Sequence, residues 1–215
     1  MALICPQCGL QYDAALFPFD RRIRCRCGAW IDLASGHTRP EDSATSDPWS
    51  VCTRMSRFLL SSPAFAHGEP IPAKYTEDGL NVSPPMCWEG VPDGTRELAL
   101  LCEDPDAPTA EPWVHWIVYQ IAPSLGFLPE DLPPRARLQR PVAVFQGRNS
   151  WHTGRTLGYR GPDPPYRHGA HRYVFRMIAL DAQLKLNPGA DRSALLSASA
   201  GHVLAETVLV GTYSR

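Results

Sequence analysis

Three short runs of β-branched, aromatic and aliphatic residues constrain the fold of this chain most. Each run is bounded by proline, glycine or aspartate turns and is too short for a surface helix. The runs span residues 97–102, 114–121 and 172–180. Runs of this length and composition are typical of central strands. The sequence therefore predicts a mainly β fold.

The C-terminal segment predicts a helix followed by a further strand. From Asp191 to about Ala205 a capping residue precedes apolar side chains at helical spacing. The predicted apolar face carries Leu196, Ala200, Val203 and Leu204. Gly201 lies within this segment and costs about 1 kcal/mol in a helix. Residues 206–213 return to strand character.

Length and charge exclude several classes of protein. A chain of 215 residues has room for one domain with a sizeable core and a small appendage. The formal net charge of −1 gives no electrostatic reason to expect nucleic acid or an anionic membrane as partner. No window approaches the roughly 18 apolar residues of a membrane span. Since residues 1–5 form neither a basic leader nor an apolar signal core, we expect a cytoplasmic protein.

Four of the seven cysteines gather in the first 27 residues and predict a metal site. Cys5 and Cys8 form a CxxCG zinc knuckle, whereas Cys25 and Cys27 are separated by one residue only. Residues 1–36 have too few apolar side chains for a core of their own, so we predict a small zinc ribbon folded by structural zinc. The alternative is a metal-free arm with four thiols. Residues 37–56 are polar and predict a linker to a domain at 57–215.

The alternation of side chains along a strand groups the titratable residues. His171 and Tyr173 share one face. His115 is predicted to share its face with Ile117, Tyr119 and Ile121. Asp104 and Asp106 flank Pro105, and extended backbone would put both carboxylates on one side. The structural alternatives are a hydrogen-bonded core histidine at 115 and a turn formed by the two aspartates.

From about residue 58 to 213 the chain resembles the phosphatidylethanolamine-binding proteins, in particular the bacterial branch described as Raf kinase inhibitor-like. The matching stretches occur in order along the chain and are specific as a set. They are residues 65–76, residues 81–85 with Trp88, Asp104 to Pro108, Trp113 to Trp116, residues 158–162, His171-Arg172-Tyr173 and Gly211-Thr212-Tyr213. The resemblance implies an antiparallel β-sandwich with few peripheral helices and an anion pocket at one end.

The resemblance also implies which residues form the pocket. They are Asp104, Asp106, His115, Pro165, His171 and Tyr173. In the family such a pocket accepts phosphate, phosphoethanolamine or other small anions. Imidazole N–H groups, a tyrosine hydroxyl and backbone amides can donate to an oxyanion, and the carboxylates would orient a histidine or receive an ammonium group. The family usually has glycine where this chain has Arg167, which either adds a phosphate ligand or narrows the entrance.

The leading hypothesis is a binding or regulatory protein that performs no covalent step. It would hold a small anionic or phosphorylated ligand, contact a protein partner through the ribbon, and modulate a kinase or protease. The alternative is a hydrolase or metal-dependent enzyme that uses Asp104, Asp106, His115 and His171. Ser150 lies near His152 without a nucleophile elbow around it. The sequence therefore favours binding over catalysis.

Overall fold

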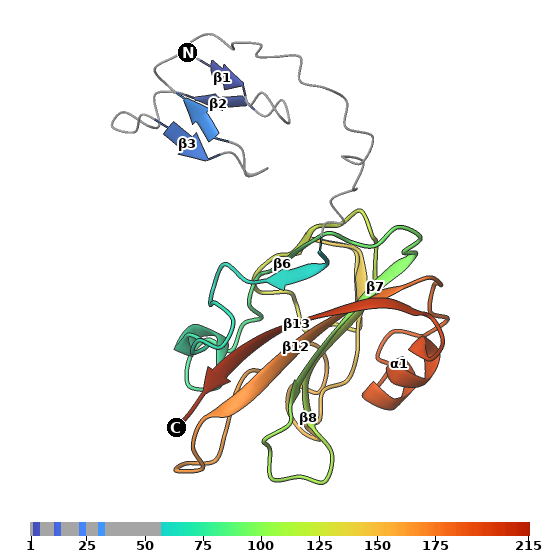
Figure 1. The fold of residues 1–215 in the computed structure, drawn as a ribbon. Helices are drawn as coiled ribbons and strands as arrows, with labels where there is room; N and C mark the ends of the chain where they lie inside the picture. Colours follow the sequence, from blue (N-terminus) through green and yellow to red (C-terminus); the bar gives the residue numbers. More distant parts are fainter. Residues whose placement is uncertain (1, 5–10, 14–21, 25–29, 33–56) are drawn as a thin grey trace. The chain divides into compact units, whose positions relative to one another are not determined.

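The computed structural model describes residues 2–4, 11–13, 22–24, 30–32 and 57–215, and the chain divides into two units, 1–53 and 54–215. The first unit has two pairs of antiparallel strands. They are β1 (Ala2–Ile4) with β2 (Gln11–Asp13) and β3 (Arg22–Arg24) with β4 (Trp30–Asp32) (Figure 1). The predicted zinc ligands Cys5, Cys8, Cys25 and Cys27 lie outside the described residues.

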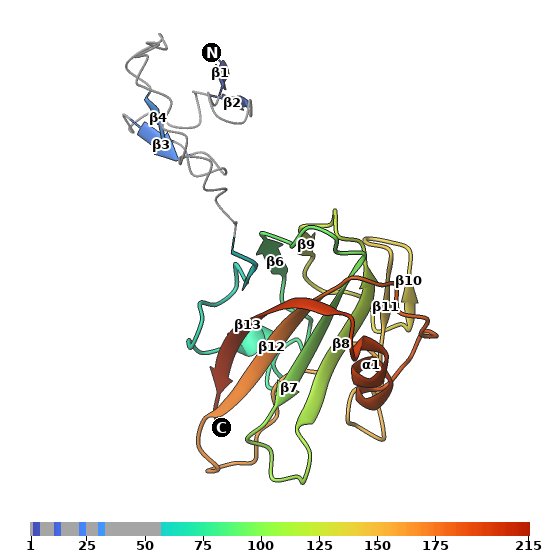
Figure 2. The ribbon, with the colours of Figure 1, turned by 45° about the vertical axis from the view of Figure 1, so that its right-hand side comes forward.

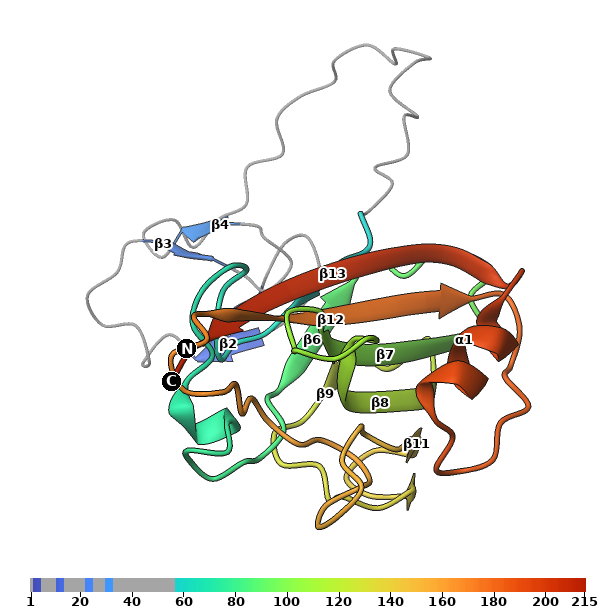
Figure 3. The same cartoon turned by 90° about the horizontal axis from the view of Figure 1, so that it is seen from below.

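The second unit is built on a six-stranded antiparallel sheet of order β10-β11-β8-β7-β12-β13. The four long strands lie side by side (Figure 3). The six strands are β7 (Glu97–Asp104), β8 (Trp113–Ile121), β10 (Arg137–Leu138), β11 (Val144–Gln146), β12 (His171–Leu180) and β13 (Val203–Tyr213). The predicted runs are thus confirmed as strands, each slightly longer than its apolar run.

A smaller sheet covers one face of the large one. It consists of β5 (Leu59–Ser61), β6 (Met86–Glu89) and β9 (Phe127–Leu128), and a 3-10 turn, η2 (Ala73–Tyr75), lies between β5 and β6 in the chain (Figure 2). One hydrophobic cluster joins residues of both sheets, among them Leu60, Met86 and Phe175. The prediction of a mainly β, antiparallel two-sheet fold is confirmed.

The other face of the large sheet packs against α1 (Arg192–Ser199), whose Leu195 joins a second cluster with Leu101 and Ile117. Because the central strands are covered on both faces, every residue of β7 is buried. This explains why its sequence is a continuous apolar run rather than an alternating one. In the described part of the chain, no helix is long and apolar enough to cross a membrane.

The predicted helix is shorter than expected. Asp191 caps α1, since its side chain accepts a hydrogen bond from the Ala194 amide at 2.9 Å. Gly201 then adopts φ +81° and turns the chain away from the helical path. Val203 and Leu204 begin β13 instead of continuing the helix. The prediction that they share a helical face is therefore wrong.

A β-bulge in β8 corrects the predicted face of His115. Cys102 pairs with Trp116 and Glu103 pairs with Val114, so His115 is an extra residue on its strand. The period of two is broken there. Ile117 packs in the cluster under α1, whereas His115 lies on the opposite side of the sheet, against Tyr173. The bulge thus turns a histidine toward the ends of β7 and β12.

Candidate ligand-binding site

A cavity of about 210 Å³ lies where β7 ends, β8 begins and β12 begins. Three loops complete its wall, and they contain residues 107–109, 151 and 163–165. The lining residues are Asp104, Ala107, Pro108, Thr109, Trp113, His115, Trp151, Asp163, Pro164, Pro165 and His171. Four of the six predicted site residues are among them. The lining is mostly apolar, with two carboxylates and two imidazoles as its titratable groups.

His171 and Asp104 form the buried polar pair of this cavity. The Nδ1 of His171 donates to Oδ2 of Asp104 at 2.7 Å, and the two side chains are 2% and 5% exposed. The other oxygen of Asp104, Oδ1, accepts from the Asp106 amide at 2.8 Å. Both carboxylate oxygens are therefore engaged, and the proton on His171 Nδ1 is fixed. The Nε2 of His171 lies 2.7 Å from Nδ1 of His168 and shares a hydrogen bond with it.

His115 has a different environment. Its Nδ1 lies 2.7 Å from the carbonyl oxygen of Arg160 and must donate, because a carbonyl only accepts. Its ring packs edge-on against Trp151 and Tyr173, with centroids 5.0 Å apart in both cases. Burial lowers the pKa of His115 to about 4, so the ring is neutral at pH 7. At neutral pH its one N–H group is therefore used by the Arg160 carbonyl.

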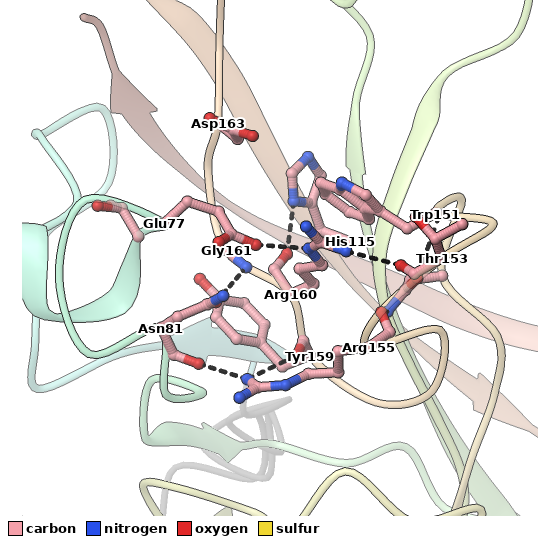
Figure 4. Close-up of polar contacts among 12 residues, drawn as sticks. Glu77, Asn81, His115, Trp151, Thr153, Arg155, Tyr159, Arg160, Gly161 and Asp163 are labelled. Atoms are coloured by element: carbon pink, nitrogen blue, oxygen red, sulfur yellow. Dashed lines mark hydrogen bonds and ion pairs between the residues drawn. The ribbon is translucent and has the colours of Figure 1, made fainter.

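Arg160 holds one wall of the cavity in place (Figure 4). Its Nε donates to Glu77, its Nη1 donates to the Thr153 carbonyl at 3.0 Å, and its guanidinium lies 4.6 Å from the centre of the Trp151 ring. The next residue, Gly161, donates its amide to Asn81 at 2.8 Å. A Cβ at Gly161 would lie 2.1 Å from the Tyr75 carbonyl oxygen, so only glycine fits there. The segment that carries the Arg160 carbonyl is thus fixed on both sides.

Two predicted site residues do not line the cavity. Asp106 turns away and accepts hydrogen bonds from the backbone amide and the guanidinium of Arg172, at 2.7 to 2.9 Å. Extended backbone ends at Asp104, so the two carboxylates do not point to one side as predicted. The Tyr173 ring packs against His115, and its buried hydroxyl has no hydrogen-bond partner among the residues that the structure describes. Burial raises the pKa of Tyr173.

Sequence reasoning assigned no site role to Trp151, Asp163 or His168, which lie in this region. The first two come from loops that reach the cavity only through long-range folding, and no local pattern indicates them. His168 could have been found, because it lies three residues before His171 next to a glycine. Arg167 is exposed, lies outside the cavity lining and adopts φ +63°. A left-handed backbone at this position explains why glycine suits it.

Comparison with known proteins identifies this architecture. The sequence profile described as phosphatidylethanolamine-binding protein matches residues 61–214. A UPF0098 protein from Methanothermobacter thermautotrophicus is 47% identical over 156 residues, which cover 73% of this chain and 98% of that protein. The profile match thus contains every residue that lines the cavity and begins at residue 61.

Two solved structures are similar. A phosphatidylethanolamine-binding protein homologue from Chlamydia trachomatis has 36% identity and a TM-score of 0.64, covering 74% of this chain and 97% of its own. YbcL of Escherichia coli, described as a member of the mammalian family, has 28% identity and a TM-score of 0.67, covering 74% and 98%. The profile and the relatives agree with the fold and with the ordered motifs. The chain belongs to the phosphatidylethanolamine-binding protein family.

Proposed function

We propose that the domain at 57–215 reversibly binds a small phosphorylated or otherwise anionic molecule, such as phosphate or phosphoethanolamine. The observation that supports this most is the convergence of His115 and His171 on one cavity from neighbouring parts of the sheet. Asp104 and Arg160 hold the two rings in defined orientations. Rings held in this way do not need to be ordered when a ligand enters, which favours recognition of a small headgroup.

The donors for an oxyanion come from several sources. The indole rings of Trp113 and Trp151 line the cavity, and indole N–H groups only donate. The His168 ring adjoins His171 and is exposed, so it can turn toward a ligand. The carboxylate of Asp163 also lines the cavity and would face an ammonium group. A zwitterion such as phosphoethanolamine therefore fits this lining, since its ammonium group brings N–H donors of its own.

The test is calorimetric titration of the full chain with inorganic phosphate and with phosphoethanolamine. We expect saturable binding that His171→Ala abolishes. His202→Ala is the matched control, because His202 bonds to Asp181 at 2.8 Å but lies on an exposed surface. An absence of heat and of NMR shifts at millimolar ligand, or equal binding by His171→Ala, would contradict the proposal.

For the first unit we propose one structural zinc ion bound by Cys5, Cys8, Cys25 and Cys27. In the sequence, one cysteine pair follows β1 and precedes β2, and the other follows β3 and precedes β4. Four thiolates between paired strands suit tetrahedral zinc and leave no open catalytic position. Elemental analysis should find about one zinc per chain. Less than about half of that, or full occupancy in Cys5→Ser/Cys8→Ser, would exclude this site.

Residues 1–36 also suggest a biological role for the whole chain. We infer a cytoplasmic regulator that modulates a partner such as a kinase or protease and contacts that partner through residues 1–36. A pull-down with the full chain and with Cys5→Ser/Cys8→Ser tests the contact. We expect a partner that the wild-type chain retains and the variant loses. Equal retention by both would place the contact on the β domain.

A further inference from the structure

His115 lines the cavity, and one of its ring nitrogens is left as a hydrogen-bond acceptor. Nδ1 carries the proton, because it bonds to the Arg160 carbonyl, and the ring holds a single proton at neutral pH as a result of its burial. Nε2 is then left with a lone pair. Among the described residues, the bond from Nδ1 to the Arg160 carbonyl is the one hydrogen bond of this ring with good geometry, and Figure 4 shows Nε2 on the side of the ring away from that carbonyl.

This arrangement cannot invert easily. The His115 ring is 2% exposed and lies between the edges of Trp151 and Tyr173. A flip of the ring would place a carbon against the Arg160 carbonyl and leave that oxygen unpaired, which costs about 1–3 kcal/mol in a buried site. The carbonyl itself is held by the contacts of Arg160 and Gly161. The acceptor character of Nε2 is therefore built into the fold.

The rest of the titratable lining also lacks free donors. Both oxygens of Asp104 accept protein hydrogen bonds. Asp163 is a carboxylate paired with Arg215. The Nδ1 proton of His171 is used by Asp104. A ligand atom that approaches His115 must thus bring its own proton, since a lone pair facing a lone pair is repulsive.

We propose that, among inorganic tetrahedral oxyanions, the cavity selects those that carry a proton, so that it binds hydrogen phosphate and rejects sulfate. Phosphate keeps at least one P–OH group at neutral pH, and that group would donate to His115 Nε2. Sulfate has nearly the same size and shape but has no proton to donate. This inference rests on the proposed function and adds a rule of selection to it.

The experiment measures how tightly each of the two anions binds the full chain at pH 7 and constant ionic strength. Calorimetry gives the two affinities, and ¹⁵N NMR reports the protonation of the histidine rings. We expect sulfate to bind about tenfold or more weakly than phosphate. The NMR signal of His115 should show Nε2 unprotonated in the free protein and shifted toward a hydrogen-bonded value when phosphate binds.

His115→Asn is the matched variant. Its amide N–H can still donate to the Arg160 carbonyl, but it has no acceptor at the position of Nε2. We expect this variant to bind the two anions within about twofold of each other. Equal binding by the wild-type chain, or a protonated Nε2 in its spectrum, would overturn the selection rule while leaving the proposed function intact. If neither anion binds the wild-type chain, the selection rule fails, and the titration with phosphoethanolamine decides whether the proposed function fails with it.

Discussion

Strand β12 has a histidine–aspartate pair at each end. At its start His171 bonds to Asp104 at 2.7 Å, with side chains 2% and 5% exposed; just after its end Asp181 bonds to His202 at 2.8 Å, with side chains 49% and 47% exposed. The chemistry and the geometry of the bond are nearly the same. Only the first pair is buried, and both of its residues line the cavity described above. Burial and surroundings therefore distinguish a candidate site from a surface contact.

The largest difference between the two pairs should be in stability. Asp104→Ala leaves His171 buried without its partner and removes the acceptor of the Asp106 amide, so we expect a loss of about 3–5 kcal/mol. Asp181→Ala breaks a solvent-exposed pair, which contributes about 0–1 kcal/mol. Urea unfolding of both variants at pH 7 measures the difference. Equal effects would mean that the buried pair has no special role in the fold.

The second prediction concerns pH at the cavity end of β12. Burial lowers the pKa of His115 from an unfolded value of about 6.5 to about 4. Between these two values the unfolded chain binds more protons than the folded chain. The stability that depends on a neutral His115 is therefore fully present above about pH 6.5 and is lost as the pH falls toward 4. The expected loss is on the order of 3 kcal/mol.

Urea unfolding from pH 7 to 4 measures this effect. His115→Asn has no titrating ring and should show a correspondingly flatter stability profile in this range. His202→Ala serves as the control from the exposed pair and should keep the wild-type slope. If the stability of His115→Asn fell with pH as steeply as that of the wild-type chain, His115 would not be the neutral hydrogen-bond acceptor inferred above.

The third prediction separates the cavity wall from an ordinary surface contact. Arg160→Gln removes the ion pair with Glu77 and the stacking on Trp151, and we expect a loss of about 1–2 kcal/mol together with weaker ligand binding. Arg137→Gln is the matched control. The Arg137 guanidinium lies 4.8 Å from the centre of the Phe145 ring, and neither residue lines the cavity. This control variant should cost about 0.5–1 kcal/mol and leave ligand affinity unchanged.

Much of this architecture could be predicted from sequence, and the failures share a cause. The strand runs follow from local composition, whereas Asp104, His115, Pro165 and His171 follow from the resemblance to a known family. The bulge at His115 depends on how β8 pairs with β7, and the turn of Asp106 toward Arg172 depends on a residue 66 positions away. Trp151 reaches the cavity from a loop with no regular period. Features set by pairing between distant segments are not visible in a local pattern.

The smallest predicted effect concerns Arg167, near the buried pair but outside the cavity lining. Its φ of +63° costs a non-glycine residue about 1–2 kcal/mol. Arg167→Gly removes this strain, but it also raises the conformational entropy of the unfolded chain, which lowers stability. We therefore expect a net stabilisation of zero to about 1 kcal/mol. Asp131→Gly, at φ +58°, is the matched control and should gain less, since aspartate tolerates this conformation better.

The same variant decides between the two roles considered for Arg167. Its side chain is exposed and absent from the cavity lining, so phosphate affinity should stay within about twofold after Arg167→Gly. A role in narrowing the entrance would show as faster ligand exchange with unchanged affinity. A tenfold loss of affinity, about 1.4 kcal/mol, would instead make Arg167 a ligand contact and extend the candidate site beyond the buried pair into the loop before β12.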